Sequence, residues 1–490
     1  MRLTLVLFVC LSLYFPAKGQ QYLSLDTLLG KEALLADLKA IYSEILAAHP
    51  NPYAFVSKEK LNESFERAEA SIDSTTSLKT FFAITCSFLR QIKDSHTGPD
   101  YEYLQRWWLE NKRGIAPIRV ISIDGALYTI SDADSLIPPG SKLACIDNRE
   151  AFKFYPDALK YSLIEGNALT GQRRITDALF TSVIGLDFPL GDSLTIDFIP
   201  YGEEDIREIK YPVYKKDKWY ARQKSLQKEG SRNLSLKFTA NDSLAVLKVG
   251  TFAPSNIRAQ EKYLRSAFKE IKEKNVQYLA VDLRDNGGGH SHQVEVLMSY
   301  LKKEGHNTPH NIIAKGSKLA RDRSFIEDNG FAKFILKLFF GRNEDVKGFI
   351  KMLELQDEKL DTLYFFDKEI QKEKYVYTGN CVLFINGLTA SAGVDFANSF
   401  YNDKRGLIIG EPCLGPHAGT FGNPASYTMK NSKLKFSIST IRYNYDDRFE
   451  YVESPIKPNV LAEVTPELLA IKKDACITAW KKYIKENAKK

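Results

Sequence analysis

A serine within a run of small residues is the first candidate for chemistry. Ser391 lies in Thr389-Ala390-Ser391-Ala392-Gly393, between the apolar run 382–385 and a helix-like segment, 394–400. A serine where a strand turns into a helix presents its hydroxyl and backbone N–H groups in one direction, and nucleophilic catalysis needs that geometry. The plain alternative is an alanine-rich turn with a helix-capping serine, and the pentapeptide alone favours that alternative.

Three consecutive glycines are the second candidate. Gly287, Gly288 and Gly289 follow the strand-like run 278–283 after three polar residues. Glycines let the backbone turn sharply and approach a ligand closely. The dinucleotide pattern GxGxxG is absent, and no Lys-Ser/Thr pair completes a phosphate loop. An oxyanion hole made of backbone N–H groups is the functional interpretation, and a flexible turn is the alternative.

A histidine in a polar loop is the candidate general base. His96 lies between Ser95 and Thr97 after a helical run, and imidazole is the usual base for a serine at neutral pH. Taken singly, such a histidine is more often an ordinary surface residue. Glu453, with Glu450 close by, could orient the base as its acid partner.

Two further histidines raise the question of a metal. His290 and His292 have alternate spacing, but no third ligand at a telling distance accompanies them. We therefore predict neither a metal nor an organic cofactor.

The elements that must position these residues differ along the chain. The runs 34–49, 58–72 and 78–92 have the apolar spacing of helices, and the third leads into the loop of His96. They predict an N-terminal helical domain over 20–107 that carries the Ser-His pair. Short β-like runs separated by glycine and proline predict a β module over 108–215.

A catalytic core follows in two parts. The run 244–249, a helix over about 257–274 and the buried strand 278–283 indicate a βαβ-like unit. We place the first part of the core at 216–302 and the second, with Ser391, at 376–490. The charged, helix-prone segment 303–375 between them is predicted to be a helical insertion.

Composition narrows the class of protein. Of the 490 residues 44% are hydrophobic and 26% charged, which is typical of a globular chain, and the net charge is +7. Basic and acidic residues are interspersed, so we predict no nucleic-acid partner. The cysteines outside the first 19 residues are odd in number, form no CxxC and are expected to be small buried hydrophobes; they are Cys86, Cys145, Cys381, Cys413 and Cys476.

The N-terminus is typical of a secretory leader. Met1-Arg2 precedes an apolar stretch, 3–15, which ends in Ala17-Lys18-Gly19. This pattern predicts a signal peptide over 1–19 that is cleaved before Gln20. Neither this run nor any other approaches the roughly 18 apolar residues of a spanning helix. We expect an exported protein, periplasmic or secreted, without stable membrane insertion.

Taken in their order along the chain, these motifs resemble those of peptidase family S41. The family includes the tail-specific or C-terminal processing proteases, the tricorn protease core and retinoid-binding relatives. The runs 49–53 and 94–97 resemble the family's N-terminal landmarks, 281–289 is similar to its D-L-R-x-N-x-G-G strand, and 389–392 matches its nucleophile motif. The resemblance covers most of the mature chain. It implies a mixed α/β (α+β) fold: a crotonase-like ββα superhelix core, an N-terminal helical unit and a degenerate PDZ-like module at 108–215.

The family has two catalytic arrangements. Processing proteases pair the serine with a lysine further downstream, but the corresponding stretch here, 410–419, has no lysine, and Lys404 and Lys430 sit at poor offsets. Tricorn-type members use a histidine from a Ser-His motif and a glutamate near a final G-[VI]-x-P-D turn. Ser95-His96 fits this arrangement, although the turn here has Pro455 and Asn459 in place of glycine and aspartate.

The resemblance therefore implies roles for specific residues. Ser391 is the nucleophile and His96 its base, with Ser95 and Glu453 orienting the imidazole. The N–H of Gly288 or Gly289, together with that of Ala392, forms the oxyanion hole. Asp395 stands where many relatives have glutamate.

The function expected from sequence is that of an exported serine-type endopeptidase acting on peptides or unfolded proteins without a cofactor. Two alternatives share the fold. One is a non-catalytic ligand- or peptide-binding protein, and the other is a hydrolase of small ester or acyl substrates. The sequence predicts no particular oligomeric state.

Overall fold

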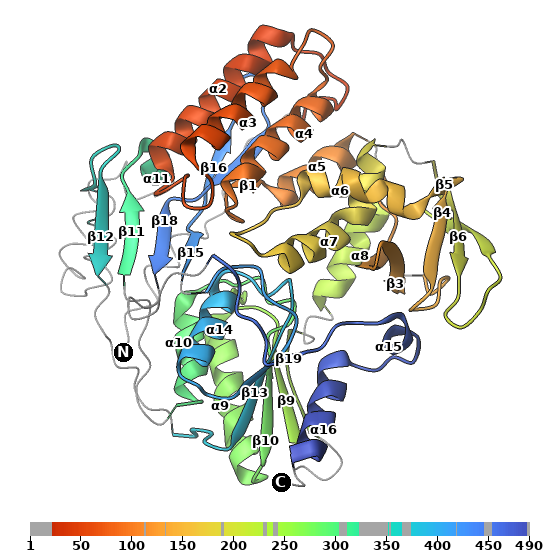
Figure 1. Cartoon of the computed structure of the whole chain (residues 1–490), viewed down its shortest axis with the longest axis vertical. Coiled ribbons are helices and arrows are strands. Elements are labelled where there is room, and N and C mark those ends of the chain that lie inside the picture. Colours follow the sequence, from red (N-terminus) through yellow and green to blue (C-terminus); the bar gives the residue numbers. More distant parts are fainter. Residues whose placement is uncertain are drawn as a thin grey trace. The chain divides into compact units, whose positions relative to one another are not determined.

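The chain forms two compact units, each assembled from segments that are distant in sequence (Figure 1). Unit 1 comprises 1–107, 308–367 and 420–448, and unit 2 comprises 108–307, 368–419 and 449–490. The structure is a computed structural model that describes residues 22–111, 114–132, 134–187, 191–228, 233–238, 244–302, 311–322, 351, 354–364, 374–417, 419–444 and 453–487. The predicted signal peptide and Glu450 lie outside the described residues.

Unit 1 begins with the predicted helices. They are α2 (Lys31–Ala48), α3 (Lys58–Ala70) and α4 (Leu78–Leu89), followed by α5 (Tyr101–Glu110). Ser57 and Ser77 cap α3 and α4 because each serine side chain accepts a backbone N–H of the first turn. The short 3-10 helix η2 (Arg90–Ile92) ends at Lys93, whose φ of 58° turns the chain into the loop of His96.

Two sheets complete unit 1. The first has the order β1-β17-β16 and the second β12-β11-β18-β15. Their strands are β1 (Gly98–Pro99), β11 (Asn311–Lys315), β12 (Leu360–Tyr364), β15 (Gly419–Gly422), β16 (Ala425–Thr428), β17 (Lys435–Ile438) and β18 (Ile441–Asn444).

The segment 303–375, predicted to be a helical insertion, thus contributes two strands to this second sheet. β11 pairs with both β12 and β18. The described residues between the two strands include the short helix α11 (Lys318–Asp322) and the helical residues Lys351 and Glu354. Sheet pairing satisfies the backbone of β11 on both edges, which local helix propensity does not take into account. Most of the segment, including 334–340, lies outside the described residues.

A β module opens unit 2. Its strands run β2-β3-β4-β6-β7, with β5 paired to β4. The short β-like runs predicted in this segment are confirmed as strands. The elements are β2 (Ile118–Ile123), β3 (Ala126–Asp132), β4 (Lys142–Ile146), β5 (Arg149–Glu150), η3 (Ala151–Phe154), α6 (Tyr155–Tyr161), α7 (Leu169–Asp187), β6 (Ser193–Ile199), β7 (Arg207–Pro212) and α8 (Lys216–Lys228).

The core of unit 2 is a six-stranded sheet with the order β19-β14-β13-β10-β9-β8. All neighbours are parallel except β8 and β9. The predicted strand, crossover helix and buried strand are confirmed as β9, α9 and β10. The core elements are β8 (Leu234–Phe238), β9 (Leu244–Val249), α9 (Ile257–Glu273), β10 (Tyr278–Asp282), α10 (Ser291–Ser299), β13 (Asn380–Ile385), α14 (Ala392–Asn402), β14 (Leu407–Gly410), β19 (Val460–Leu461), α15 (Pro466–Ala470) and α16 (Ala475–Asn487).

Both faces of this sheet are buried. Alternate residues of β10 and β13, such as Leu279 and Leu383, pack against α9, α10 and α14, whereas Ala280 and Phe384 pack against α16 and its Trp480. Figure 1 shows the three helices on one face and α16 on the other. Because parallel strands covered on both faces are apolar throughout, these strands appear in the sequence as continuous apolar runs. The mixed α/β fold is confirmed.

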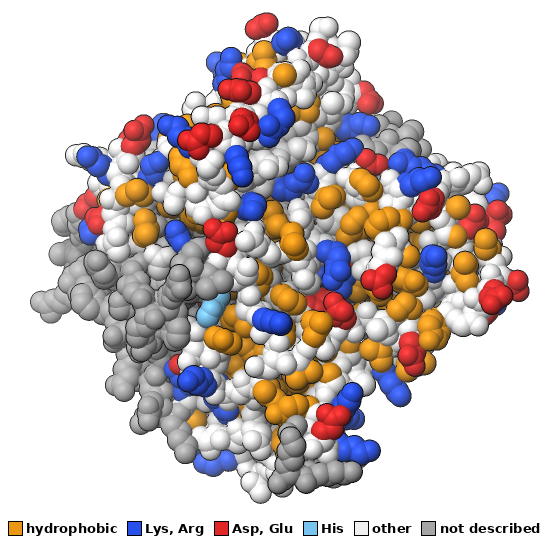
Figure 2. Space-filling model, in the orientation of Figure 1, with side chains coloured by type: hydrophobic (Ala, Val, Ile, Leu, Met, Phe, Trp, Pro, Cys, Tyr) orange, Lys and Arg blue, Asp and Glu red, His pale blue; other side chains and the backbone are white. Residues whose placement is uncertain are grey.

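Several composition-based expectations can be compared with this structure. The five described cysteines are free thiols, and all except Cys145 are buried. Figure 2 shows basic and acidic side chains interspersed over the visible face. Among the described helices, none has the length and apolarity that crossing a membrane requires.

Candidate active site

Four loops of unit 2 meet beyond the carboxyl ends of β9, β10, β13 and β14. The Ala390 N–H donates to Asn286 O at 2.9 Å, and the Phe252 N–H donates to Gly288 O at 2.9 Å. The Leu414 N–H donates to Thr389 O at 2.9 Å. Ligands of open α/β sheets bind at this edge, because the loops that follow parallel strands converge there. Ser391 and the three glycines therefore share one edge of one sheet.

Ser391 has an unusual backbone conformation. It precedes α14 with φ 50° and ψ −123°, and its side chain makes no capping hydrogen bond with the helix. Its carbonyl oxygen accepts the N–H of Val394 at 2.7 Å and that of Asp395 at 3.1 Å. A non-glycine residue at such a φ is strained, and strain of this kind persists where neighbouring structure enforces it. The simpler alternative of a capping serine is therefore wrong, and the half-buried hydroxyl is available for other chemistry.

Gly288 contacts the serine directly. Its φ is 96°, and a Cβ added to it would lie 2.6 Å from Ser391 Cβ and 2.9 Å from Ala392 N. Only a residue without a side chain fits against this turn. Gly287, by contrast, has nothing within 4 Å of an added Cβ.

Asn286 holds the glycine loop and the serine loop together. Its side chain is fully buried, donates to Val249 O at 2.9 Å and accepts the Gly288 N–H at 2.8 Å. Its backbone oxygen accepts the Ala390 N–H, as described above. Sequence reasoning assigned no role to this residue, although its place before the glycines is the signal that could have found it.

The hydrogen bonds distinguish the candidate oxyanion donors. The Gly288 N–H is occupied by Asn286, whereas the N–H groups of Gly289 and Ala392 donate to no described residue. Phe252 pairs with the residues on either side of Gly289, so the Gly289 N–H points away from that strand. Ala392 is the first residue of α14, where helix N–H groups lack intrahelical acceptors.

A buried ion pair supports the loop after β14. Arg174 of α7 donates through Nε to Glu411 Oε2 at 2.9 Å and pairs with Asp177 at 2.9 Å. A second hydrogen bond joins Arg174 Nη2 to Glu411 Oε1. Since the Glu411 N–H donates to Ile385 O at 3.1 Å, this pair anchors the β module to the end of the strand that leads to the serine.

Glu453, the predicted acid partner, is an exposed residue of unit 2. Its backbone oxygen accepts the Asn167 N–H at 3.0 Å and its Oε2 accepts Asn167 Nδ2 at 3.3 Å. Asn459, which replaces the family's aspartate, accepts the Ile408 N–H of β14 at 2.8 Å through Oδ1. An amide oxygen serves this role as well as a carboxylate does, so the substitution leaves the turn intact.

Other titratable residues of unit 2 have their own contacts. Lys404 follows the far end of α14, roughly 18 Å from Ser391 at the usual helical rise. His292 lies 3.4 Å from Glu261 and 3.5 Å from Glu295, and the hydrogen bond with Glu295 raises its pKa. Burial and the neighbouring His292 lower the pKa of His290. His292 thus belongs to a cluster of ion pairs with carboxylates at α10, and His290 lies beside it.

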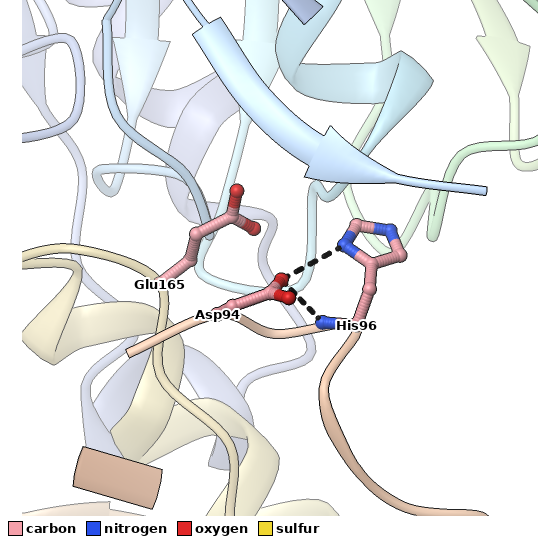
Figure 3. A group of neighbouring side chains, drawn as sticks. All are labelled: Asp94, His96 and Glu165. Carbon is pink, nitrogen blue, oxygen red and sulfur yellow. Dashed lines mark hydrogen bonds and ion pairs between the residues drawn. The ribbon is translucent and has the colours of Figure 1, made fainter. Parts of the chain in front are cut away.

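The Ser-His pair belongs to unit 1. Ser95 Oγ lies 3.4 Å from His96 Nδ1, and the His96 N–H donates to Asp94 Oδ1 at 2.9 Å. Figure 3 shows Asp94 directed at the backbone and ring of His96; the third residue drawn, Glu165, belongs to unit 2. The structure therefore brings Ser391, Gly288, Gly289 and Ala392 together in unit 2, and Ser95 and His96 together in unit 1.

Asp94 and His49 form a buried pair in unit 1. Both side chains are inaccessible to solvent, and His49 Nε2 lies 3.1 Å from Asp94 Oδ2. Burial alone would raise the pKa of Asp94, but hydrogen bonds from His49 and His96 outweigh burial and lower it well below its usual range. The motifs that contain these residues were noted in the sequence, whereas their pairing across 45 positions was not.

Comparison with known proteins gives a family match over part of the chain, and a fold. A family model described as peptidase family S41 matches residues 243–461, which include the glycine loop and Ser391. No curated protein matches the chain. Among solved structures the chain is similar to mature CPAF, with a TM-score of 0.62 and 14% identity over 93% of this chain and 96% of that one. Mature CPAF complexed with lactacystin gives 0.63 and 15%, over 93% and 97%.

Proposed function

We propose that the chain is an exported serine endopeptidase of peptidase family S41 that hydrolyses peptides or unfolded proteins; the match of the family model to residues 243–461 is the premise. One observation carries the proposal. Ser391 has a strained backbone at the carboxyl edge of the sheet, its hydroxyl does not cap the helix, and Gly288 leaves space against it. Nucleophilic serines on strand-to-helix turns have this combination of strain and exposure.

The proposed reaction uses groups of the protein alone. Ser391 Oγ attacks the scissile carbonyl carbon while His96 takes the hydroxyl proton. The N–H groups of Gly289 and Ala392 stabilise the oxyanion, and Gly288 keeps the space beside it open. The C–N bond then breaks as His96 returns the proton to the leaving amine. Water then attacks the acyl carbon while His96 takes its proton; the ester C–O bond breaks, and His96 returns the proton to Ser391 Oγ.

Two polar residues complete the proposed machinery. Ser95 contacts His96 Nδ1 and is proposed to orient the ring. Glu453 is proposed as an acid partner by family resemblance. No metal or organic cofactor is required by this chemistry, because a base and two N–H donors supply what acyl transfer needs.

Covalent labelling tests the nucleophile. A fluorophosphonate probe should label the wild-type chain, and Ser391→Ala should abolish this labelling. The same variant should lower the rate of peptide hydrolysis by about 10⁴-fold or more. Ser399→Ala is the matched control, since Ser399 is a half-buried serine of the same helix and should leave both unchanged. Labelling that survives Ser391→Ala would contradict the proposal.

A pair of histidine variants tests the base. His96→Ala should lower kcat by about 10³-fold or more and abolish probe labelling. His290→Ala should have little effect, although His290 directly follows the glycine loop of unit 2. If His290→Ala inactivates the enzyme and His96→Ala does not, the base is assigned to the wrong histidine.

The substrate class follows from digestion assays. A peptide library and an unfolded protein should be cleaved, and ester substrates alone should not account for the activity. Exclusive cleavage of esters would make the chain a small-substrate hydrolase, and the absence of any turnover or labelling would favour a binding protein on this fold.

Export and substrate capture are further parts of the proposal. If residues 1–19 are removed on export, the protein isolated from the periplasm or medium should begin at Gln20, which N-terminal sequencing checks.

The module 108–215 is proposed to be PDZ-like and to hold the C-terminus of the substrate as an added strand. Substrates with an amidated C-terminus should then be cleaved more slowly than those with a free carboxylate.

A further inference from the structure

The protonation of His49 follows from its two hydrogen bonds. The Asn51 N–H donates to His49 Nδ1 at 3.1 Å, so this nitrogen must offer a lone pair. The ring proton then resides on Nε2, which lies 3.1 Å from Asp94 Oδ2. His49 is therefore a neutral donor, and the buried pair carries the single negative charge of Asp94.

The Thr97 hydroxyl also donates to this carboxylate. Thr97 Oγ1 accepts the Ser439 N–H at 3.0 Å, and its own proton points to Asp94 Oδ2 at 2.6 Å. Oδ2 thus receives two hydrogen bonds from buried donors. This arrangement holds an anion in a place where an isolated carboxylate would be neutral, because hydrogen bonds to the charged form offset the cost of desolvation.

The other carboxylate oxygen faces His96. Oδ1 accepts the His96 N–H at 2.9 Å and lies 3.7 Å from His96 Nδ1. The His96 side chain is 17% exposed, whereas that of Asp94 is wholly buried. A carboxylate on the Nδ1 side leaves Nε2 as the basic nitrogen, which is the division of roles that a serine nucleophile requires.

Among the described residues of unit 1, Arg442 is a cation that lies farther from the pair of His49 and Asp94. The ring of Phe421 packs on His49, with ring centroids 4.6 Å apart, and the guanidinium of Arg442 lies 5.5 Å from the centroid of Phe421. Phe421 thus contacts both His49 and the guanidinium of Arg442. Within the described part of unit 1, His96 carries the titratable side chain that lies against Asp94 Oδ1.

We propose that Asp94 is a positioning residue that orients His96 through Nδ1 and balances the charge formed when Nε2 takes the serine proton. The inference rests on the proposed function, in which His96 is the base. It adds a second acid partner to Glu453, the one that the family resemblance supplies. The carboxylate of Glu453 is held by an exposed amide hydrogen bond, whereas that of Asp94 is fixed by donors from three residues, two of them buried.

Nuclear magnetic resonance of ¹⁵N-histidine in the full chain tests the geometry without reference to activity. At pH 8 the ¹⁵N shifts should show His96 protonated on Nδ1 and His49 protonated on Nε2, with His96→Gln and His49→Gln used for assignment. A neutral His96 ring protonated on Nε2 would overturn the inference. Because this measurement is made on the wild-type protein, it does not depend on whether any variant folds.

An isosteric variant tests the charge. Asp94→Asn keeps an oxygen for the His96 N–H but removes the carboxylate, so the titration midpoint of His96 should fall by about one pH unit or more. Asp73→Asn is the matched control, because Asp73 also accepts hydrogen bonds from threonines in a loop of unit 1 but contacts no histidine in the described structure. An unchanged midpoint in folded Asp94→Asn would overturn the inference.

Kinetics separate this inference from the proposed function. Asp94→Asn should lower kcat about a hundredfold with little change in KM, and Glu453→Gln should have a smaller effect. If His96→Ala is fully active, the proposed function fails. If His96→Ala is inactive while Asp94→Asn retains wild-type kcat and His96 titration, the inference alone fails.

Discussion

The loop of Ser391 and the loop of His96 are built in different ways. In unit 2 the backbone itself makes the site: Ser391 is held at φ 50°, Gly288 at φ 96°, and inter-loop hydrogen bonds fix both. In unit 1 side chains make it, since His49 and Thr97 converge on the buried carboxylate of Asp94. One loop depends on the space that a missing Cβ leaves, and the other on a charge.

This difference indicates which changes each loop tolerates. Backbone N–H groups cannot be removed by a side-chain substitution, so the serine loop should be damaged mainly by added atoms. A network around a carboxylate keeps its shape when an isostere is introduced but loses its electrostatics. Substitutions that add atoms to the serine loop, or remove charge from the His96 loop, test this difference.

Among the variants that compare the two loops without removing the nucleophile or the base, the largest effect is expected from Gly288→Ala. The added Cβ would lie 2.6 Å from Ser391 Cβ and 2.8 Å from Ala390 O, at a φ that alanine rarely adopts. Displacement of the nucleophile should lower kcat/KM by about a hundredfold or more in a protein that still folds. Peptide hydrolysis and circular dichroism measure the two quantities.

Gly287→Ala is the control for that variant. Nothing lies within 4 Å of its added Cβ, and its φ is not positive. Activity should stay near that of the wild type. Equal losses in both variants would mean that loop flexibility, and not space beside Ser391, limits the reaction.

An intermediate effect is expected when Asp94 loses its charge. At neutral pH Asp94→Asn should cost about 2–3 kcal/mol of unfolding free energy, through loss of charge-assisted hydrogen bonds. Because burial is outweighed by hydrogen bonds from His49 and His96, the folded pKa of Asp94 lies below its unfolded value. Its stabilisation is therefore fully present above about pH 4 and is lost as pH falls below that value.

Urea unfolding between pH 7 and pH 2 measures this dependence. Below about pH 4 the wild type should lose up to about 1.4 kcal/mol per pH unit more than Asp94→Asn does. Parallel pH profiles for the two proteins would show that folding does not lower the pKa of Asp94, and would contradict the prediction.

The smallest effect compares two buried threonines. Thr97 donates to Asp94 and accepts the Ser439 N–H, whereas Thr389 donates to Leu283 O at 2.9 Å and accepts the Asn386 N–H at 3.1 Å. The bonding pattern is the same, but the acceptor is charged in one case and neutral in the other.

Threonine-to-valine substitution at each position should separate the two acceptors. Thr97→Val should destabilise the protein by about 1 kcal/mol more than Thr389→Val, since hydrogen bonds to charged groups are the stronger ones. Thermal and urea unfolding provide the measurement. A larger cost for Thr389→Val would contradict the view that the His96 loop depends on charge.

Much of the fold could be predicted from sequence because its elements have strong local signals. The apolar runs of β9 and β10 and the periodic spacing of α9 indicate their structure without reference to neighbours. The strands of 311–315 and 360–364 were missed, since β12 pairs with β11 and β11 pairs with β18, and these partners lie far apart in the chain. Local propensity does not contain such a pairing.

The sequence by itself determined the candidate chemistry: a serine among small residues, three glycines after a buried strand and a Ser-His pair. Residue type and spacing carry that information, because each chemical role needs particular atoms. Tertiary structure decided how those atoms are used. The positive φ of Ser391, the occupied N–H of Gly288 and the neutral form of His49 all depend on the conformation that each loop adopts in the folded chain.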